Sequence, residues 1–290
     1  MAATLPRNIQ LKLDQTLNQW RQWRCDPPLP GPPQFVSAFE SGVSNHSVLV
    51  GEEQRFVIRI DGVNAANNSL SRSWEWRVLH CAHEAGLAPC PRYYNPELGV
   101  LVCDYLPPDN DCENDLCDTA ALLRSIHKLP AFHHRLDLRE RFTRYEKQVE
   151  HQNRELPALM ASCREKVLSL LATIIDDDDT PVPCHNDLLA ANRIVSGKKL
   201  RAIDWEYCAM GSFWFDLAVV AIGDHLDSGQ QQELLTAYLE REATPRESLK
   251  FSQNCLIYQY LELLWYLANT REAIEQRLRE LQLALSRGNY

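Results

Sequence analysis

A proline-rich break at Pro107-Pro108-Asp109-Asn110-Asp111 separates two stretches of the chain whose apolar residues follow different periods. Before the break, short apolar runs alternate with turn residues, a pattern that predicts antiparallel strands. After the break, apolar residues recur at the spacing of an α-helix. We therefore expect an α+β fold in which a small sheet lobe is joined to a larger, mainly helical lobe.

The small lobe is expected to contain a five-stranded sheet and one helix. An amphipathic helix at 9–23 precedes it and ends before a stiff, proline-rich connector. The domain boundaries that follow are an amino-terminal segment at 1–33, a small lobe at 34–106 and a helical lobe at 107–290. The predicted strands are 34–40, 46–50, 55–60, 92–95 and 100–105, and the predicted helix is 69–85.

The helical lobe is expected to contain a single β-like insert, at 192–204. Asp118 is the predicted N-cap of its first helix, and Thr244, followed by Pro245 in the first turn, is the predicted N-cap of a later one. The predicted helices are 119–128, 139–155, 158–175, 230–242, 245–269 and 271–286.

Charge and composition limit the partners that this chain can have. It carries 30 Lys and Arg against 39 Asp and Glu, a net charge of −9. Such a surface repels nucleic acid and anionic lipid, so we expect a small-molecule partner, and neither nucleic acid nor a membrane. The ten cysteines are scattered without a CxxC pair, and there is no apolar leader segment. These features are typical of a cytoplasmic protein with free thiols.

The residues that can carry chemistry gather in one stretch of the second half. In His185-Asn186-Asp187, the aspartate precedes Asn192 by five residues, and Asp204 follows Asn192 by twelve. The turn signal at 196–199 separates two short apolar runs. If these runs pair as a hairpin, Asn192 and Asp204 emerge together at its open end, with Asp187 on the loop that leads into it.

Phosphoryl transfer requires such a set of oxygen-bearing side chains. A carboxylate must accept or orient the proton of the attacking hydroxyl, and two oxygen ligands must hold Mg²⁺ on the phosphates. The protein-kinase pattern, H-R-D with an Asn five residues beyond the Asp, has the same spacing as the stretch 185–192. The alternative is structural: Asp187 caps a helix and Asn192 closes a turn.

Two upstream features can bind phosphate. The turn between the first two strands contains Ser41, Gly42, Ser44 and Asn45, which can present backbone N–H groups to phosphates or form a plain hairpin turn. Arg59, in the third strand, lies where a kinase carries its phosphate-binding Lys. Glu75 in the next helix can pair with Arg59, unless both are surface residues.

These motifs resemble those of the aminoglycoside phosphotransferase and choline kinase superfamily, small-molecule kinases related in fold to protein kinases. The segment Ile203-Asp204-Trp205-Glu206-Tyr207 is similar to the I-D-[FWY]-E-Y motif of bacterial choline kinases and thiamine kinases. Arg59 in place of Lys and Arg72 three residues before Glu75 are also similar to those groups, as is the helix end Leu123-Arg124-Ser125-Ile126-His127.

The resemblance implies a protein-kinase-like two-lobe fold with a nucleotide-binding small lobe and a catalytic and substrate lobe. It implies ATP and Mg²⁺ as cofactors, Asp187 as the catalytic base, and Asn192 and Asp204 as magnesium ligands. Arg59 and Glu75 would serve the nucleotide phosphates. The remaining implied roles are a hinge beside the adenine for Asp104 and Tyr105, and a structural role for His185 and for Asp216, which would brace the catalytic loop.

Aromatic and acidic side chains in the carboxyl half predict a cationic acceptor, because aromatic faces and a carboxylate together bind such ions. The candidate contacts are Trp205, Glu206, Tyr207 and Trp265, with core packing as the alternative for the aromatic residues. The predicted reaction is ATP- and Mg²⁺-dependent phosphorylation of the hydroxyl of choline, thiamine or ethanolamine. An aminoglycoside-type antibiotic phosphotransferase and a catalytically inactive nucleotide-binding protein are the alternatives.

Overall fold

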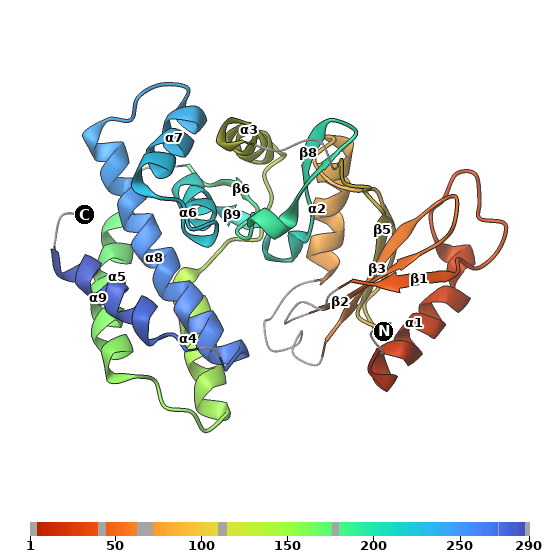
Figure 1. The fold of residues 1–290 in the computed structure, drawn as a ribbon, viewed down its shortest axis with the longest axis horizontal. Coiled ribbons are helices and arrows are strands. Elements are labelled where there is room, and N and C mark those ends of the chain that lie inside the picture. Colours follow the sequence, from red (N-terminus) through yellow and green to blue (C-terminus); the bar gives the residue numbers. More distant parts are fainter. Residues whose placement is uncertain are drawn as a thin grey trace. The chain divides into compact units, whose positions relative to one another are not determined.

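A five-stranded antiparallel sheet and a larger set of helices make the chain an α+β protein, as predicted (Figure 1). The computed structural model describes residues 5–39, 45–62, 72–109, 115–175, 180–271 and 273–287. The chain divides into two units. The first is Met1–Cys112 with Ile194–Tyr207, and the second is Glu113–Arg193 with Cys208–Tyr290.

The sheet of the first unit has the strand order β1-β2-β3-β5-β4, and each neighbouring pair is antiparallel. All five predicted strands are present. The predicted helix at 69–85 is found as α2, Arg72–Glu84, with residues 69–71 outside the described part. The strands are β1 Phe35–Ala38, β2 Asn45–Val50, β3 Phe56–Asp61, β4 Pro91–Asn95 and β5 Val100–Asp104.

The amino-terminal helix is part of the core of the first unit. This helix, α1, covers Arg7–Asn18 and buries Ile9 and Leu13 in the same apolar cluster as Ile58 and Ile60 of β3. The prediction of one helix continuing to residue 23 is wrong, because the chain leaves α1 through a short 3₁₀ turn at Trp20–Gln22. The segment therefore closes one side of the sheet.

Strand β3 lies at the centre of the sheet and carries Arg59. Arg59 pairs in register with Ser47 of β2 and Leu101 of β5. Because side chains alternate between the faces of a strand, Arg59 points away from the face that holds Ile58 and Ile60. The sheet thus buries apolar residues on one face and carries the guanidinium of Arg59 on the other.

All six predicted helices of the second unit are present. Two of them, at 158–175 and 245–269, have the predicted bounds, and Thr244 caps the latter in a capping box with Glu247. The helices are α3 Leu116–Ile126, α4 Leu138–His151, α5 Ala158–Ile175, α7 Ser228–Leu239, α8 Pro245–Asn269 and α9 Glu275–Arg287. Among the described residues, no helix combines the length and the apolar character that crossing a membrane requires.

The second unit differs from the prediction in the bounds of most helices, in one cap and in one additional helix. The N-cap of α3 is Asp115, because its side chain accepts the backbone N–H of Asp118, which is the third residue of the helix. Helix α6, Phe213–Gly223, was missed because residues 214–221 are all buried and leave no amphipathic stripe. Helix α9 begins at Glu275, four residues later than predicted.

The β structure of the second half is also richer than predicted. The expected hairpin is present as β7, Arg193–Ser196, and β8, Lys199–Ala202, joined by Gly197 and Lys198 with φ of 58° and 59°. Two positive φ values are typical of a type I′ hairpin turn. An additional antiparallel pair, β6 Val182–Cys184 and β9 Ala209–Gly211, was missed because three-residue strands show no alternation.

Candidate active site

The loop between β6 and β7 carries Asp187 and Asn192, and we call residues 185–192 the catalytic loop, after the role that the sequence predicts for Asp187. Its second residue, Asn186, is in the left-handed region, at φ 61°, and the loop ends in a 3₁₀ turn at Ala190–Asn192. Asn192 donates its side-chain amide hydrogens to the backbone oxygen of Asp187, at 2.8 Å, and to its Oδ2, at 3.0 Å. The amide nitrogen therefore faces Asp187, and the amide oxygen is the atom left to bind a cation.

Asp216, near the start of α6, fixes the beginning of the catalytic loop. Its carboxylate accepts the backbone N–H groups of His185, at 2.9 Å, and Asn186, at 2.7 Å. It also contacts His127 Nε2 at 2.9 Å. Burial alone would raise the pKa of Asp216, but the His127 contact and the backbone donation hold that pKa below its ordinary value. Asp216 is thus a fully buried carboxylate that three donors keep ionised.

The predicted ion pair between Arg59 and Glu75 is present, and both residues are buried rather than on the surface. Arg59 Nη2 lies 2.5 Å from Glu75 Oε2, and Arg59 Nη1 lies 2.6 Å from Asp204 Oδ1. Asp204 follows β8 and has a left-handed φ of 61°. Aspartate is one of the residues that tolerate this conformation, and here it turns the carboxylate onto Arg59.

A second arginine extends this ion network. Arg72 Nη1 lies 2.6 Å from Glu206 Oε2 and 3.0 Å from Glu75 Oε2, and Arg72 Nη2 lies 2.7 Å from Asp61 Oδ1. The sequence offered Arg72 only as a family feature and gave no signal for Asp61. The arginine network of the first unit therefore consists of Arg59, Arg72, Asp61, Glu75, Asp204 and Glu206.

Two cations face four carboxylates in the arginine network, so acidic side chains outnumber basic ones. Burial and the neighbouring Glu206 raise the pKa of Asp204 above its ordinary value, although Arg59 opposes this shift. Burial would also raise the pKa of Glu206, but Arg59 and Arg72 outweigh it and hold that pKa low. Hard oxygen donors with excess negative charge are suited to a divalent cation such as Mg²⁺.

Two of the predicted acceptor contacts, Trp205 and Glu206, directly follow Asp204 in the chain. Trp205 is 1% exposed, and its indole N–H donates to the backbone oxygen of Ala202 at 3.0 Å. Glu206 is held by Arg72 and by the side-chain amide of Asn45, at 3.0 Å. These contacts place Trp205 in the core and Glu206 in the arginine network, and the contact of each with a substrate cation stays a prediction.

The other predicted nucleotide contacts lie within the first unit. Ser41, Gly42 and Ser44 fall outside the described residues. Asp104 binds Arg92 through both carboxylate oxygens, each at 2.7 Å. The backbone N–H of Tyr105 donates to the oxygen of Arg55 at 3.0 Å. The proposed hinge beside an adenine therefore stays a prediction.

The aromatic residues of α8 divide into core and partly exposed groups. Tyr258 is buried, and its burial and the charge of Asp187 raise its pKa. Trp265 is only partly buried and packs edge-on against Tyr266, with ring centroids 5.2 Å apart. The guanidinium of Arg277, from α9, lies 4.2 Å from the centre of the Tyr266 ring.

One buried group of metal-ligand type occurs in the second unit, at His127, Cys184 and Asp216. Its polar atoms are already hydrogen-bonded. His127 binds Asp216 and, through Nδ1, the Tyr238 hydroxyl at 2.8 Å, and Asp216 also accepts two backbone N–H groups. A metal ion here would have to break these bonds, so the group is structural.

Comparison with known proteins identifies the family. Residues 36–251 match the family model described as "Phosphotransferase enzyme family". The thiamine kinase of Escherichia coli O1:K1 / APEC is 31% identical over 221 residues, which cover 72% of this chain and 73% of the relative.

Two solved structures share the fold. The choline kinase LicA from Streptococcus pneumoniae has a TM-score of 0.74 at 21% identity, covering 87% of this chain and 94% of its own. An ADP-bound aminoglycoside phosphotransferase, APH(2'')-Ib, has a TM-score of 0.61 at 15% identity and covers 97% of this chain and 98% of its own. With the family match over most of its length, the chain belongs to the phosphotransferase enzyme family and is a small-molecule kinase.

Proposed function

We propose that this kinase transfers the γ-phosphate of ATP, with Mg²⁺, to the hydroxyl of a small cationic alcohol, and that thiamine is the first acceptor to test. The observation that carries the proposal is the catalytic loop, in which Asp187 and Asn192 contact each other while Asp216 holds the loop at its start. Thiamine leads because of the thiamine kinase that is 31% identical to this chain. Choline and ethanolamine follow.

Asp187 is proposed to orient the acceptor hydroxyl and to accept its proton. Its carboxylate is partly exposed, which an acceptor requires, and the Asn192 amide limits its rotation. A positioned carboxylate of this kind contributes about 10²–10⁴-fold to the rate. Holding the hydroxyl in line with the phosphate is the larger part of catalysis in phosphoryl transfer.

Asn192 and Asp204 are proposed to hold the magnesium ion. An amide oxygen and a carboxylate are ligands that Mg²⁺ prefers, and Asp204 belongs to the arginine network, in which carboxylates outnumber cations. When bound, Mg²⁺ neutralises charge on the transferred phosphoryl group. Both ligands are proposed from the spacing of the motif, in which Asp204 follows Asn192 by twelve residues.

Arg59 is proposed to bind the nucleotide phosphates. A guanidinium can bind two phosphate oxygens at once, and Glu75 fixes its direction from α2. The contact of Arg59 with Asp204 occupies one Nη group, and a phosphate would compete for that group.

The acceptor cation is proposed to contact Trp265 or Tyr207, both of which are partly buried and not enclosed in the core. Tyr266, beside Trp265, already holds the guanidinium of Arg277 over its ring, and Glu262 lies 3.7 Å from the same guanidinium. This arrangement illustrates how an aromatic face and a carboxylate on α8 bind a cation together.

The test is an acceptor screen with the purified chain. Thiamine, choline, ethanolamine and an aminoglycoside are each incubated with MgATP, ADP release is followed in a coupled assay, and the phosphorylated product is identified by mass spectrometry. We expect ADP release with thiamine that stops in the Asp187→Ala variant. Release with the aminoglycoside alone would replace the proposal by antibiotic phosphorylation. ATP binding without release for any acceptor would indicate an inactive nucleotide-binding protein.

A further inference from the structure

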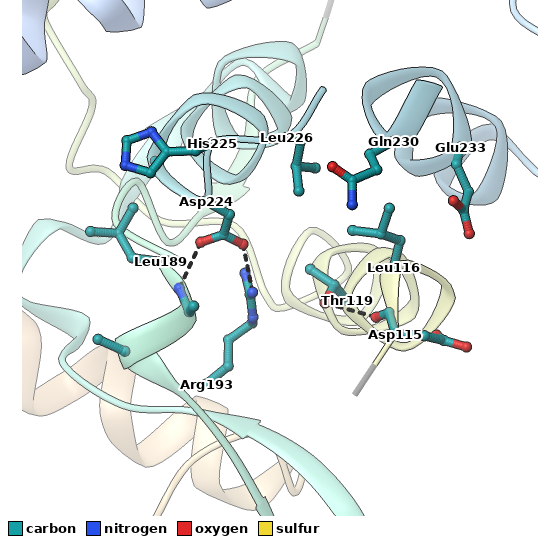
Figure 2. A pocket seen from close by; sticks show the side chains of 13 residues that line it. Asp115, Leu116, Thr119, Leu189, Arg193, Asp224, His225, Leu226, Gln230 and Glu233 are labelled. Carbon is teal, nitrogen blue, oxygen red and sulfur yellow. Dashed lines mark hydrogen bonds and ion pairs between the residues drawn. The ribbon is translucent and has the colours of Figure 1, made fainter. Parts of the chain in front are cut away.

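Asp224, at the carboxyl end of α6, contacts the far end of the catalytic loop. Its Oδ1 accepts the backbone N–H of Ala190 at 2.8 Å, and its Oδ2 lies 2.5 Å from Arg193 Nη2. Figure 2 shows the carboxylate of Asp224 directed toward Arg193. Both residues line a cavity of about 740 Å³. One carboxylate thus links α6 to both sides of Asn192.

Arg193 completes this link from the loop side. It directly follows Asn192, and its Nη1 donates to the backbone oxygen of Leu188 at 2.9 Å. The side chains of Arg193 and Asp224 are only 7% and 8% exposed, so the pair is screened little by solvent. The guanidinium therefore bridges the backbone next to Asp187 and the end of α6.

The position of Asp224 is unfavourable for an acidic residue unless a cation accompanies it. Asp224 is the C-cap of α6, and His225, with φ 56°, ends the helix. The backbone N–H groups of His225 and Leu226 return to the oxygens of Ile222 and Ala221, at 3.0 and 2.9 Å. The negative end of the helix dipole repels a carboxylate here, and Arg193 offsets this repulsion.

Close packing at Gly223 supports the same contact. A Cβ atom at this position would lie 2.2 Å from Cδ2 of Leu189, so the absence of a side chain lets Leu189 of the catalytic loop rest on the last turn of α6. Together with Asp216, which holds the first residues of the loop, α6 contacts the loop at both ends.

We propose that Asp224 and Arg193 form a clamp that positions Asn192 relative to Asp187, which makes both of them positioning residues for phosphoryl transfer. The inference rests on the proposed function for the chemistry of the loop, but the contact itself does not depend on it. A loop displaced by about 1 Å can lose on the order of 100-fold in rate, so the clamp should act on kcat.

The test combines kinetics with hydrogen–deuterium exchange on the wild type and on Asp224→Ala, Asp224→Asn, Arg193→Ala and the Asp224→Ala/Arg193→Ala double variant. We expect kcat to fall about 10- to 100-fold in either alanine variant, with the KM for ATP changing less than about twofold. The double variant should lose less than the product of the two single losses, because both single variants remove the shared Asp224–Arg193 contact while each also removes one contact of its own. Asp224→Asn, which still accepts the Ala190 N–H, should lose less.

Exchange measures the clamp without using activity. In Asp224→Ala, a peptide covering 185–193 should exchange at least about tenfold faster, while peptides from α8 stay unchanged. Arg164→Ala is the matched control, because it removes an ion pair of similar length, 2.6 Å to Glu146, without touching the loop. It should leave both kcat and the exchange of the loop unchanged.

Two outcomes would overturn the clamp: unchanged exchange of the loop in Asp224→Ala, or additive losses of kcat in the double variant. Failure of the proposed function has a different signature. The wild type would then release no ADP with any acceptor, and the exchange data alone would decide whether Asp224 holds the loop. If Asp224→Ala does not fold, Asp224→Asn and Arg193→Ala supply the same comparisons.

Discussion

The arginine network of the first unit and the catalytic loop of the second position their polar side chains in different ways. In the network, charged side chains from separate elements neutralise one another, as Arg72 does with Asp61 and Glu206. In the loop, carboxylates of one helix accept backbone N–H groups. The network therefore depends on each partner's charge, whereas the loop depends on the position of α6.

The largest effect is expected from Asp187→Ala, which separates chemistry from binding. We expect kcat to fall about 10²–10⁴-fold, because the acceptor hydroxyl loses its base, while the Kd for ATP changes little. Steady-state kinetics and calorimetric titration with ATP measure the two quantities. Retention of more than a few per cent of kcat would remove Asp187 from this role.

Arg72→Ala tests the network as a set of mutually dependent charges. Its removal leaves Asp61 and Glu206 without their main cation, so we expect a loss of about 3–5 kcal/mol in the free energy of unfolding. Urea denaturation measures this loss. The control is Arg144→Ala, whose partner Glu140 is 67% exposed, and it should change stability by less than about 0.5 kcal/mol. Equal effects for the two variants would contradict the distinction.

Asp216→Asn tests whether an ionised Asp216 stabilises the loop, through the pH dependence of the free energy of unfolding. The expected change is smaller than for Arg72→Ala. Because the pKa of Asp216 is lowered in the folded protein, its ionised form adds stability above the unfolded value near 3.8, and this stability disappears as the pH falls through the folded pKa. We expect the variant to be about 1–3 kcal/mol less stable at pH 7 and to approach the wild type in acid. Urea denaturation at pH 7 and at several pH values below 3.8 measures the difference, which should shrink only in the acidic part of the series. A difference that stays constant with pH would contradict the ionised Asp216.

Local patterns predicted most of the fold, because strands, amphipathic helices and caps are set by neighbouring residues. Thr244 was found from its sequence context alone. Helix α6 was missed because it is apolar on all sides, although it carries Asp216. Hydrophobic periodicity detects only elements that expose one face.

Residues of the candidate site could be predicted where they belong to a motif with fixed spacing. They could not be predicted where only tertiary contacts bring their side chains together. Asp187 and Asn192 were found from their spacing, and the Arg59–Glu75 pair from their order in strand and helix. The ion pair between Glu206 and Arg72 was not predicted, because nothing in the sequence shows that the two side chains lie beside each other. Asp224 belongs to no motif, and only its fold-dependent contacts distinguish it.

The packing of α1 determines how this protein should be trimmed for laboratory work. The family match begins at residue 36, but Ile9 and Leu13 are 1% and 0% exposed because they fill the sheet core together with residues far along the chain. A fragment cut at the family boundary would open this core to water. The expressed protein should therefore retain the residues before 36. Aggregation of a shortened version would reflect the opened core and would not be evidence that the protein lacks kinase activity.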